Sequence, residues 1–298
     1  MPAPRLHPDQ VPTDVDLVRR LLAEQHPRWA HLPAREVDSF GTDHDVYRLG
    51  ADLAVRLPKV AFSAGQAALE ATWLPRLAPH LPVALPEHLA AGRPGCGYPF
   101  AWSVCRWLPG RPASPATDDT AALASDLAEF LGALHDAPTT GAPARRAGAR
   151  GGPLAERDGQ VRAAVTELGD RVDARAVLRV WEEALEAPGW GGPEVWVHGD
   201  PLPGNLLVRG GRLSAVIDWG ALAVGDPACD LQGAWNLLGA AHRARLRDAL
   251  AVDDAQWLRG RGWVVAQAVV ALPYYWDTNP GIVAQGLRAL GEVLTSEG

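Results

Sequence analysis

The sequence predicts an α+β fold with two lobes: an N-terminal lobe built on an antiparallel sheet with a helix, and a mainly helical C-terminal lobe that carries a hairpin. Strand and turn patterns are concentrated between residues 37 and 107. From residue 118 onward, apolar residues mostly recur with helical spacing. At 298 residues the chain suits two units better than one, so we expect lobes at 1–106 and 107–298.

The N-terminal lobe is expected to begin with an amphipathic helix over residues 11–24, whose apolar side chains share one face. A second helix is expected over residues 64–77. The expected strands are the segments bounded by turn-forming residues, namely strand–turn–strand over 37–49, then 53–57, 82–86 and 98–107.

The C-terminal lobe is expected to be helical on both sides of one short strand and one hairpin. An apolar stripe from Leu123 to Leu134 predicts a helix, with Asp118 or Asp119 as its N-cap. Residues 138–154 are rich in Gly, Pro, Ala and Arg, which predicts a flexible loop. Further helices are expected at 159–187 with a break near Gly169, at 228–250, at 254–271 and at 280–295.

The hairpin is expected to bring two polar residues together. Residues 206–208 and 213–217 read as its strands, because Gly210 and Gly211 between them suit the positive φ angles of a tight turn. Asn205 precedes the first strand and Asp218 follows the second, so antiparallel pairing places them side by side.

A strand at residues 194–197 leads into His198-Gly199-Asp200, five residues before Asn205. Asp200 and Asp218 each occur commonly as turn caps. Their combination with Asn205 instead suits phosphoryl transfer, in which a carboxylate orients the acceptor hydroxyl and hard oxygen ligands hold Mg²⁺ beside nucleotide phosphates.

Protein kinases arrange the same groups as H-R-D-x-x-x-x-N and D-F-G, and these residues resemble the aminoglycoside phosphotransferase family. Gly225 to Leu231 is similar to the family's G-D-P-x-x-D-L segment, and Leu131 to His135 to its L-x-x-L-H helix end. The resemblance covers roughly residues 35–295. It implies the bilobal protein-kinase-like fold and transfer of the γ-phosphate of ATP, or GTP, to a small-molecule hydroxyl.

The resemblance also implies roles for single residues. In the C-terminal lobe, Asp200 would be the catalytic base, Asn205 and Asp218 would hold Mg²⁺, and His198 would brace the loop. In the N-terminal lobe, Arg56 would contact phosphates and pair with Glu70; Lys59 is a rival cation, but Pro58 is expected to end the strand before Lys59 turns inward. The remaining nucleotide-binding residues implied are Ser39, Phe40, Gly41 and Thr42 over the phosphates, and Cys105 and Trp107 at the hinge.

The acceptor is the least determined part of this prediction. The cluster Tyr274, Tyr275, Trp276 and Asp277 suggests a cleft wall for a ring-bearing acceptor, bordered by the loop at 138–158. The resemblance favours an antibiotic hydroxyl, modified in resistance or self-protection, with a metabolite such as choline or a sugar as the alternative. Carboxylates that could receive a polycationic aminoglycoside are Glu156, Asp158, Glu182, Glu183, Asp253, Asp254 and Asp277.

Composition and missing motifs exclude other classes. The formal net charge of −7 argues against nucleic acid or an anionic membrane as the partner. No apolar run reaches the ~20 residues of a membrane span, and residues 1–20 lack a signal-peptide core, so we expect a cytoplasmic protein. A metal-dependent hydrolase generally recruits further histidines, and the sequence has no H-x-H or H-E-x-x-H pattern. A pseudokinase would not need all of Asp200, Asn205 and Asp218. A P-loop kinase is excluded because no G-x-x-x-x-G-K-[ST] sequence occurs.

Overall fold

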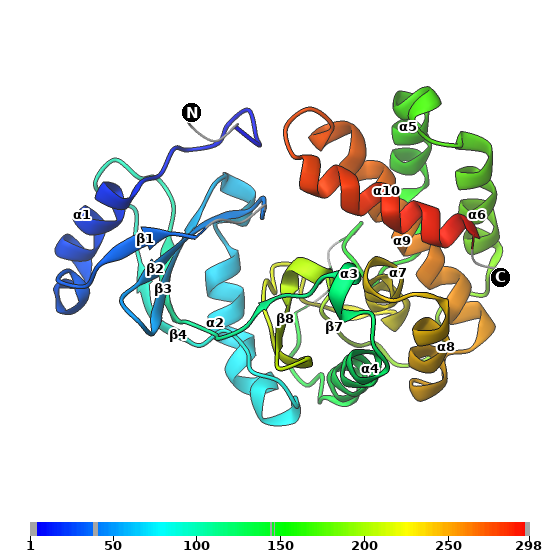
Figure 1. The fold of residues 1–298 in the computed structure, drawn as a ribbon, viewed down its shortest axis with the longest axis horizontal. Coiled ribbons are helices and arrows are strands. Elements are labelled where there is room, and N and C mark those ends of the chain that lie inside the picture. Colours follow the sequence, from blue (N-terminus) through cyan, green and yellow to red (C-terminus); the bar gives the residue numbers. More distant parts are fainter. Residues whose placement is uncertain (1–4, 38–40, 144, 146, 296–298) are drawn as a thin grey trace. The chain divides into compact units, whose positions relative to one another are not determined.

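The computed structural model describes residues 5–37, 41–143, 145 and 147–295. The chain divides into two compact units (Figure 1), the first comprising Met1–Pro79 with Ala84–Pro109 and the second His80–Val83 with Gly110–Gly298. The antiparallel sheet lies in the first unit and most helices lie in the second, so the predicted fold class is confirmed. The assignment of nucleotide and acceptor binding to separate lobes stays a prediction.

The first unit is built on a five-stranded sheet in the order β1-β2-β3-β5-β4, in which all neighbours are antiparallel. Its strands are β1 (Ala34–Glu36), β2 (His44–Leu49), β3 (Leu53–Pro58), β4 (His88–Gly92) and β5 (Trp102–Arg106). The prediction of a strand at 82–86 was wrong, because β4 begins at His88. Pro82 and Pro86 have no N–H to donate to a ladder, which explains why pairing starts after them.

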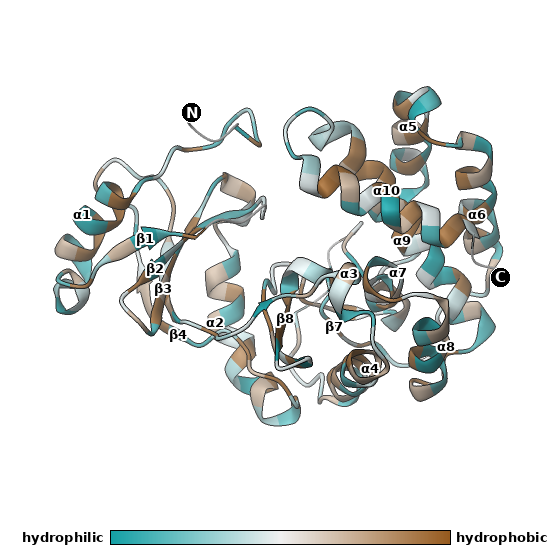
Figure 2. Cartoon of the chain, viewed as in Figure 1, coloured by the Kyte–Doolittle hydropathy of each residue, from teal (hydrophilic) through white to brown (hydrophobic). Residues whose placement is uncertain are grey.

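Two helices accompany this sheet, α1 (Val15–Gln25) and α2 (Gln66–Leu77), and both confirm the predicted helices. Asp14 caps α1 by accepting a hydrogen bond from the N–H of Leu17. Val18 and Leu21 of α1 are fully buried in one cluster with Tyr47 of β2. Hydrophilic and hydrophobic residues both occur along α1 (Figure 2), as expected of a helix with one buried face.

The second unit is mainly helical. Its helices are α3 (Pro115–Asp118), α4 (Ala121–Asp136), α5 (Asp158–Leu168), α6 (Ala174–Glu186), α7 (Gln232–Leu237), α8 (Ala240–Ala249), α9 (Asp254–Tyr275) and α10 (Pro280–Thr295). Helix α9 packs against α5, α6, α7 and α10, and is the central helix of this group. No helix in the described part of the chain combines the length and the apolar character needed to cross a membrane.

The N-cap prediction for α4 was wrong. Thr120 caps this helix by accepting from the N–H of Leu123. Asp118 instead accepts two hydrogen bonds from Arg111, and Asp119 accepts from the N–H of Gly239. The carboxylates of Asp118 and Asp119 are therefore bonded to other parts of the unit, and Thr120, the next residue along the chain, caps the helix.

The predicted hairpin is confirmed as β8 (Leu206–Arg209) and β9 (Arg212–Val216), with positive φ angles of 61° and 77° at Gly210 and Gly211. Beyond β9, the N–H of Ile217 donates to the carbonyl of Asn205 at 2.9 Å, so the pairing continues to the residue before Asp218. The other strands of this unit are β6 (Arg111–Pro112), which pairs with β8, and β7 (Val195–Val197), which pairs with β10 (Ala223–Gly225).

Candidate active site

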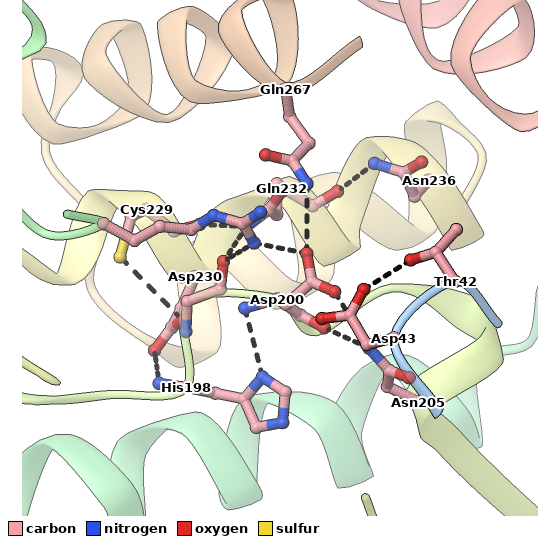
Figure 3. Close-up of polar contacts among 12 residues, drawn as sticks. Thr42, Asp43, His198, Asp200, Asn205, Cys229, Asp230, Gln232, Asn236 and Gln267 are labelled. Atoms are coloured by element: carbon pink, nitrogen blue, oxygen red, sulfur yellow. Dashed lines mark hydrogen bonds and ion pairs between the residues drawn. The ribbon is translucent and has the colours of Figure 1, made fainter. Parts of the chain in front are cut away.

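The catalytic loop begins where β7 ends, with His198, Gly199 and Asp200. Gly199 has a φ of 78°, and a Cβ atom at this position would lie 3.0 Å from the carbonyl oxygen of Ala221. Both the backbone angle and the close neighbour therefore favour glycine here. The resulting turn directs His198 and Asp200 to different surroundings (Figure 3).

His198 is fully buried, and its ring nitrogens are bonded to backbone groups. The N–H of Asp200 donates to its Nδ1 at 3.1 Å, so Nε2 carries the proton and donates to the carbonyl of Ile217 at 3.1 Å. Burial lowers the pKa of His198, which favours this neutral form. These contacts connect the catalytic loop to the end of the hairpin and suit the predicted bracing role.

Asp230 holds the same loop, although the sequence patterns assigned it no separate role. Its side chain is fully buried, and its two oxygens accept from the N–H groups of His198 at 3.1 Å and Gly199 at 2.7 Å. His135, at the end of α4, lies 3.1 Å from the same carboxylate. The two sequence segments that resemble family motifs therefore meet at one buried contact. The feature of the sequence that could have indicated this contact is His135, a histidine at the end of an apolar helix.

Asp200 is oriented by donors from three separate segments, and two of these donors, Asn205 and Gln267, are labelled in Figure 3. Asn205 donates through Nδ2 to Asp200 Oδ2 at 3.0 Å and to the Asp200 carbonyl at 2.9 Å. Gln267 of α9 donates to Oδ1 at 3.1 Å, and Arg150 donates to the same oxygen. The sequence identified Asp200 and Asn205 by their spacing, without predicting this contact, and missed Arg150 and Gln267, for which no local pattern exists.

Asn205 and Asp218 provide the ligand types that Mg²⁺ prefers. Because Asn205 directs its NH₂ group at Asp200, its contact with Asp200 leaves the amide oxygen for another partner. Asp218 is partly buried and has a φ of 62°, an uncommon angle for a residue other than glycine and one that occurs often at functional sites. Among the described residues no group of three His, Cys, Asp or Glu side chains suits a metal ion, but Mg²⁺ commonly completes its shell with substrate phosphates and water.

In the first unit, the predicted ion pair between Arg56 and Glu70 is confirmed, with Arg56 Nη1 2.5 Å from Glu70 Oε2. The same oxygen lies 2.8 Å from His88 Nε2, and Gln66 donates to the other oxygen at 2.7 Å. Burial favours the neutral acid, but Arg56 and these hydrogen bonds outweigh it and lower the pKa of Glu70. Burial also opposes protonation of His88, yet its hydrogen bonds to Cys105 and Glu70 raise its pKa to about 9.

The expectation that Lys59 could not turn inward was wrong. Its side chain is buried, and Nζ donates to the carbonyl of Gly41 at 2.8 Å and lies 3.4 Å from Asp45 Oδ1. Strand β3 continues through Pro58, so Lys59 follows it directly and holds the turn at Gly41. In that turn Thr42 donates to Asp43 at 2.7 Å. Ser39 and Phe40 lie outside the described residues.

The predicted hinge residues lie at the end of β5 and just beyond it. Cys105 is buried, and its sulfur lies 3.5 Å from His88 Nδ1, which joins it to the Arg56–Glu70 group. The N–H of Trp107 donates to the carbonyl of Asp52 at 2.8 Å, and the guanidinium of Arg48 lies 4.1 Å from its ring centroid. Their part in nucleotide binding stays a prediction.

The predicted acceptor cluster lies at the C-terminal end of α9. Tyr274 is 49% exposed, and it follows Gln267 by seven residues, so both side chains leave the same face of the helix about 10 Å apart. Tyr275 contacts Tyr274 edge to face, and Arg171 lies 4.6 Å from the ring centroid of Trp276. Asp277 is exposed. Contact of these residues with an acceptor stays a prediction.

The fold is shared with solved structures of antibiotic phosphotransferases. The GDP and kanamycin complex of APH(2")-IIia matches with a TM-score of 0.73 and 18% identity, covering 93% of this chain and 97% of that one. Macrolide 2'-phosphotransferase MphH from Brachybacterium faecium matches with a TM-score of 0.61 and 24% identity, covering 96% and 100%. Macrolide 2'-phosphotransferase type I matches with a TM-score of 0.65 and 21% identity, covering 97% and 99%.

A search of curated protein sequences found no match. A family model, described as the APH phosphotransferase enzyme family, matches residues 35–264 and thus includes the Arg56–Glu70 pair, the catalytic loop and the hairpin. Because that match spans well over half of the chain, the protein belongs to the APH phosphotransferase enzyme family.

Proposed function

We propose that the protein transfers the γ-phosphate of ATP, or GTP, to a hydroxyl group of a small antibiotic. The observation that carries this proposal is the pair of hydrogen bonds from Asn205 to Asp200, next to the hairpin whose second strand ends two residues before Asp218. These hydrogen bonds give one carboxylate a fixed orientation, and the backbone hydrogen bond from Ile217 to Asn205 joins the start of the hairpin to the residue before Asp218. Phosphoryl transfer depends mainly on such positioning and on electrostatic stabilisation.

In this mechanism Asp200 accepts a hydrogen bond from the acceptor hydroxyl and takes its proton late in the transfer. Asn205 keeps the carboxylate in place, while the amide oxygen of Asn205 and the carboxylate of Asp218 would hold Mg²⁺. When bound, the ion neutralises negative charge on the nucleotide phosphates. His198 stays neutral and braces the loop, so that Asp200 is the only base assigned to the hydroxyl.

Nucleotide binding is assigned to the first unit. Arg56 is the proposed phosphate contact, since Glu70 fixes the guanidinium and a planar fork suits two phosphate oxygens. Ser39, Phe40, Gly41 and Thr42 would cover the phosphates through their N–H groups, and main-chain groups from Cys105 to Trp107 would pair with the base. Lys59 is not assigned to the nucleotide, because it already holds the carbonyl of Gly41.

The antibiotic acceptor is supported by the fold neighbours, whose printed names include a kanamycin complex and two macrolide phosphotransferases. We assign the acceptor to the face of the second unit that includes Gln267 and the cluster from Tyr274 to Asp277. Screening nucleotide turnover against aminoglycosides, macrolides, nucleoside antibiotics, choline and simple sugars tests this choice. Turnover with a metabolite alone would replace the antibiotic but keep the phosphotransferase.

Exchange of Asp200 for Asn tests the reaction itself. The Asp200→Asn enzyme should lose a factor of about 10²–10⁴ in kcat, the usual contribution of a positioned general base, while its nucleotide affinity stays close to that of the wild type. Asp173→Asn is the matched control, because Asp173 lies outside the catalytic loop as the N-cap of α6, and Asn caps a helix equally well. Near-normal turnover by Asp200→Asn would show that another group is the base. Phosphate release from a phosphoester without nucleotide would point to a hydrolase instead.

A further inference from the structure

Arg150 forms the least expected contact in the second unit. It lies in the segment at 138–154 that the sequence predicts to be a flexible loop, yet its Nη1 donates both to Asp200 Oδ1 and to the carbonyl of Gly199. The side chains of Arg150 and Asp200 are 20% and 22% exposed, so this pair is neither sealed in the core nor open to bulk water. A cation is therefore in direct contact with the proposed base.

The backbone beside Arg150 is tied to the unit by close contacts. The N–H of Asp226 donates to the carbonyl of Gly151 at 2.8 Å. A Cβ atom on Gly225 would lie 2.3 Å from that same oxygen, and Gly151 has a φ of 78°. Arg259 in turn holds Asp226 through a hydrogen bond of 2.7 Å. Arg150 therefore extends from a fixed backbone, and its contact with Asp200 is a built feature of the fold.

A second arginine lies near Arg150. Arg157 is close enough that its pKa is lowered first by burial and then by the charge of Arg150, an effect that Glu156 opposes. A guanidinium keeps its proton throughout the ordinary pH range. The positive charge beside Asp200 is therefore permanent.

The carboxylates that could have received a polycation are used elsewhere in the unit. Glu156 pairs with Arg145, and Asp158 and Glu182 both pair with Arg162. The remaining ones are also engaged: Glu183 with Arg261, Asp254 with Arg247, and Asp253 as the N-cap of α9. Only Asp277 has no such role among the described contacts, so most of the acidic residues that could have lined an acceptor site are already engaged with neighbouring groups.

We propose that Arg150 is a positioning and specificity residue of the acceptor site. It holds Asp200 in place and compensates the negative charge of that carboxylate beside the hydroxyl to be phosphorylated, so that the acceptor is a neutral or singly charged compound, and polycations gain no net attraction there. This inference rests on the proposed function, because it assumes that Asp200 faces the acceptor. Without Arg150, an ammonium group about 5 Å from the uncompensated Asp200 carboxylate near the protein surface would be attracted strongly enough to raise affinity by a factor on the order of 10–10².

Two substitutions separate the two roles. Arg150→Gln removes the charge but keeps an N–H donor for Asp200, whereas Arg150→Lys keeps the charge but loses the planar fork. Arg179→Gln is the matched control, because Arg179 is an exposed arginine of α6 that approaches only Glu183 at 4.0 Å among the described ion pairs. The probes are kanamycin, a polycation, and erythromycin, a singly charged macrolide.

For turnover, the wild type should have a kcat/KM at least about 10-fold higher for erythromycin than for kanamycin. Arg150→Gln should shift this ratio at least about 10-fold toward kanamycin. Arg150→Lys should keep the ratio and lower kcat, since its single ammonium holds Asp200 less well. A wild type that prefers kanamycin, or a ratio that Arg150→Gln leaves unchanged, would overturn the proposal and leave the phosphotransferase assignment intact.

Calorimetric titration with kanamycin gives a readout that needs no turnover. Arg150→Gln should bind kanamycin at least about 10-fold more tightly than the wild type and Arg179→Gln, with thermal unfolding showing that all three are folded. Equal binding by wild type and Arg150→Gln, including no detectable binding by either, overturns the role of Arg150. Failure of the proposed function is a separate result, namely no nucleotide turnover by the wild type with any acceptor.

Discussion

Arg56 donates to Glu70 in the first unit and Arg150 donates to Asp200 in the second, but the two pairs differ in which partner is left accessible. The Glu70 side chain is fully buried while that of Arg56 is 14% exposed. Asp200 and Arg150 are both about one fifth exposed, at 22% and 20%. Glu70 therefore serves to fix a cation, whereas Asp200 is itself held in place and stays available for chemistry.

The donors around the two carboxylates fit this difference. Glu70 is also bonded to Gln66 and His88, both from its own unit's helix and sheet, and has no open side. Asp200 receives a side-chain amide on each oxygen, from Asn205 and Gln267. A buried carboxylate that loses its cation leaves an uncompensated charge, while an accessible one that is replaced costs function more than stability.

The largest expected effect follows from replacing Asp218, the carboxylate that we propose as a Mg²⁺ ligand. Asp218→Ala should reduce kcat by about 10³-fold or more, because charge on the phosphates is no longer neutralised. It should also weaken binding of Mg·ATP, measured by calorimetry. Asp170→Ala, at an exposed position after α5, is the control. Unchanged binding of Mg·ATP by Asp218→Ala would remove Asp218 from the metal site.

The second effect concerns the scaffold in the first unit. Glu70→Gln should lower the free energy of unfolding by about 3 kcal/mol, since it leaves the largely buried Arg56 without its counter-charge. It should also raise the nucleotide KM while leaving the acceptor KM unchanged. Urea unfolding and steady-state kinetics measure the two. Glu129→Gln, on the exposed face of α4, should change neither. A higher acceptor KM in Glu70→Gln would contradict the division of roles.

The smallest effect is a pH dependence of stability in the first unit. The pKa of His88 is raised from 6.5 to about 9. Its protonated form therefore contributes stability that is complete below pH 6.5 and is lost as the pH rises through about 9, at most about 3 kcal/mol. Urea unfolding between pH 6 and pH 10 should show this loss in the wild type, and His88→Gln should flatten it. The exposed His80 provides a control, since His80→Gln should leave the pH profile unchanged.

What the sequence could predict was set by local patterns. The Gly210-Gly211 turn fixes the hairpin, and the hairpin fixes Asn205 opposite Ile217, so these positions followed from spacing alone. The Arg56–Glu70 pair followed from a strand and the next helix together with the family resemblance. Such features can be predicted because the residues that form them lie within about 20 positions of one another in the sequence.

The missed residues depend on contacts between distant segments. Arg150 and Gln267 reach Asp200 from 50 and 67 residues away, and Asp230 reaches His135 from 95 residues away. Packing of α4, α9 and the 138–154 loop brings them together, and no periodicity encodes that packing. Lys59 was misjudged for a related reason: Pro58 does end β3, as expected, but Lys59 just beyond it still turns inward and donates to the carbonyl of Gly41, 18 residues away.

The contact between Asp230 and the catalytic loop has a consequence for the motions of this unit. The amide protons of His198 and Gly199 are bonded to a fully buried carboxylate that also holds the end of α4. Exchange of such protons with solvent requires opening of the surrounding core, so the loop should be protected to nearly the same degree as the helices beneath it. The proposed base, Asp200, thus directly follows a segment that should open about as slowly as the helices of its unit.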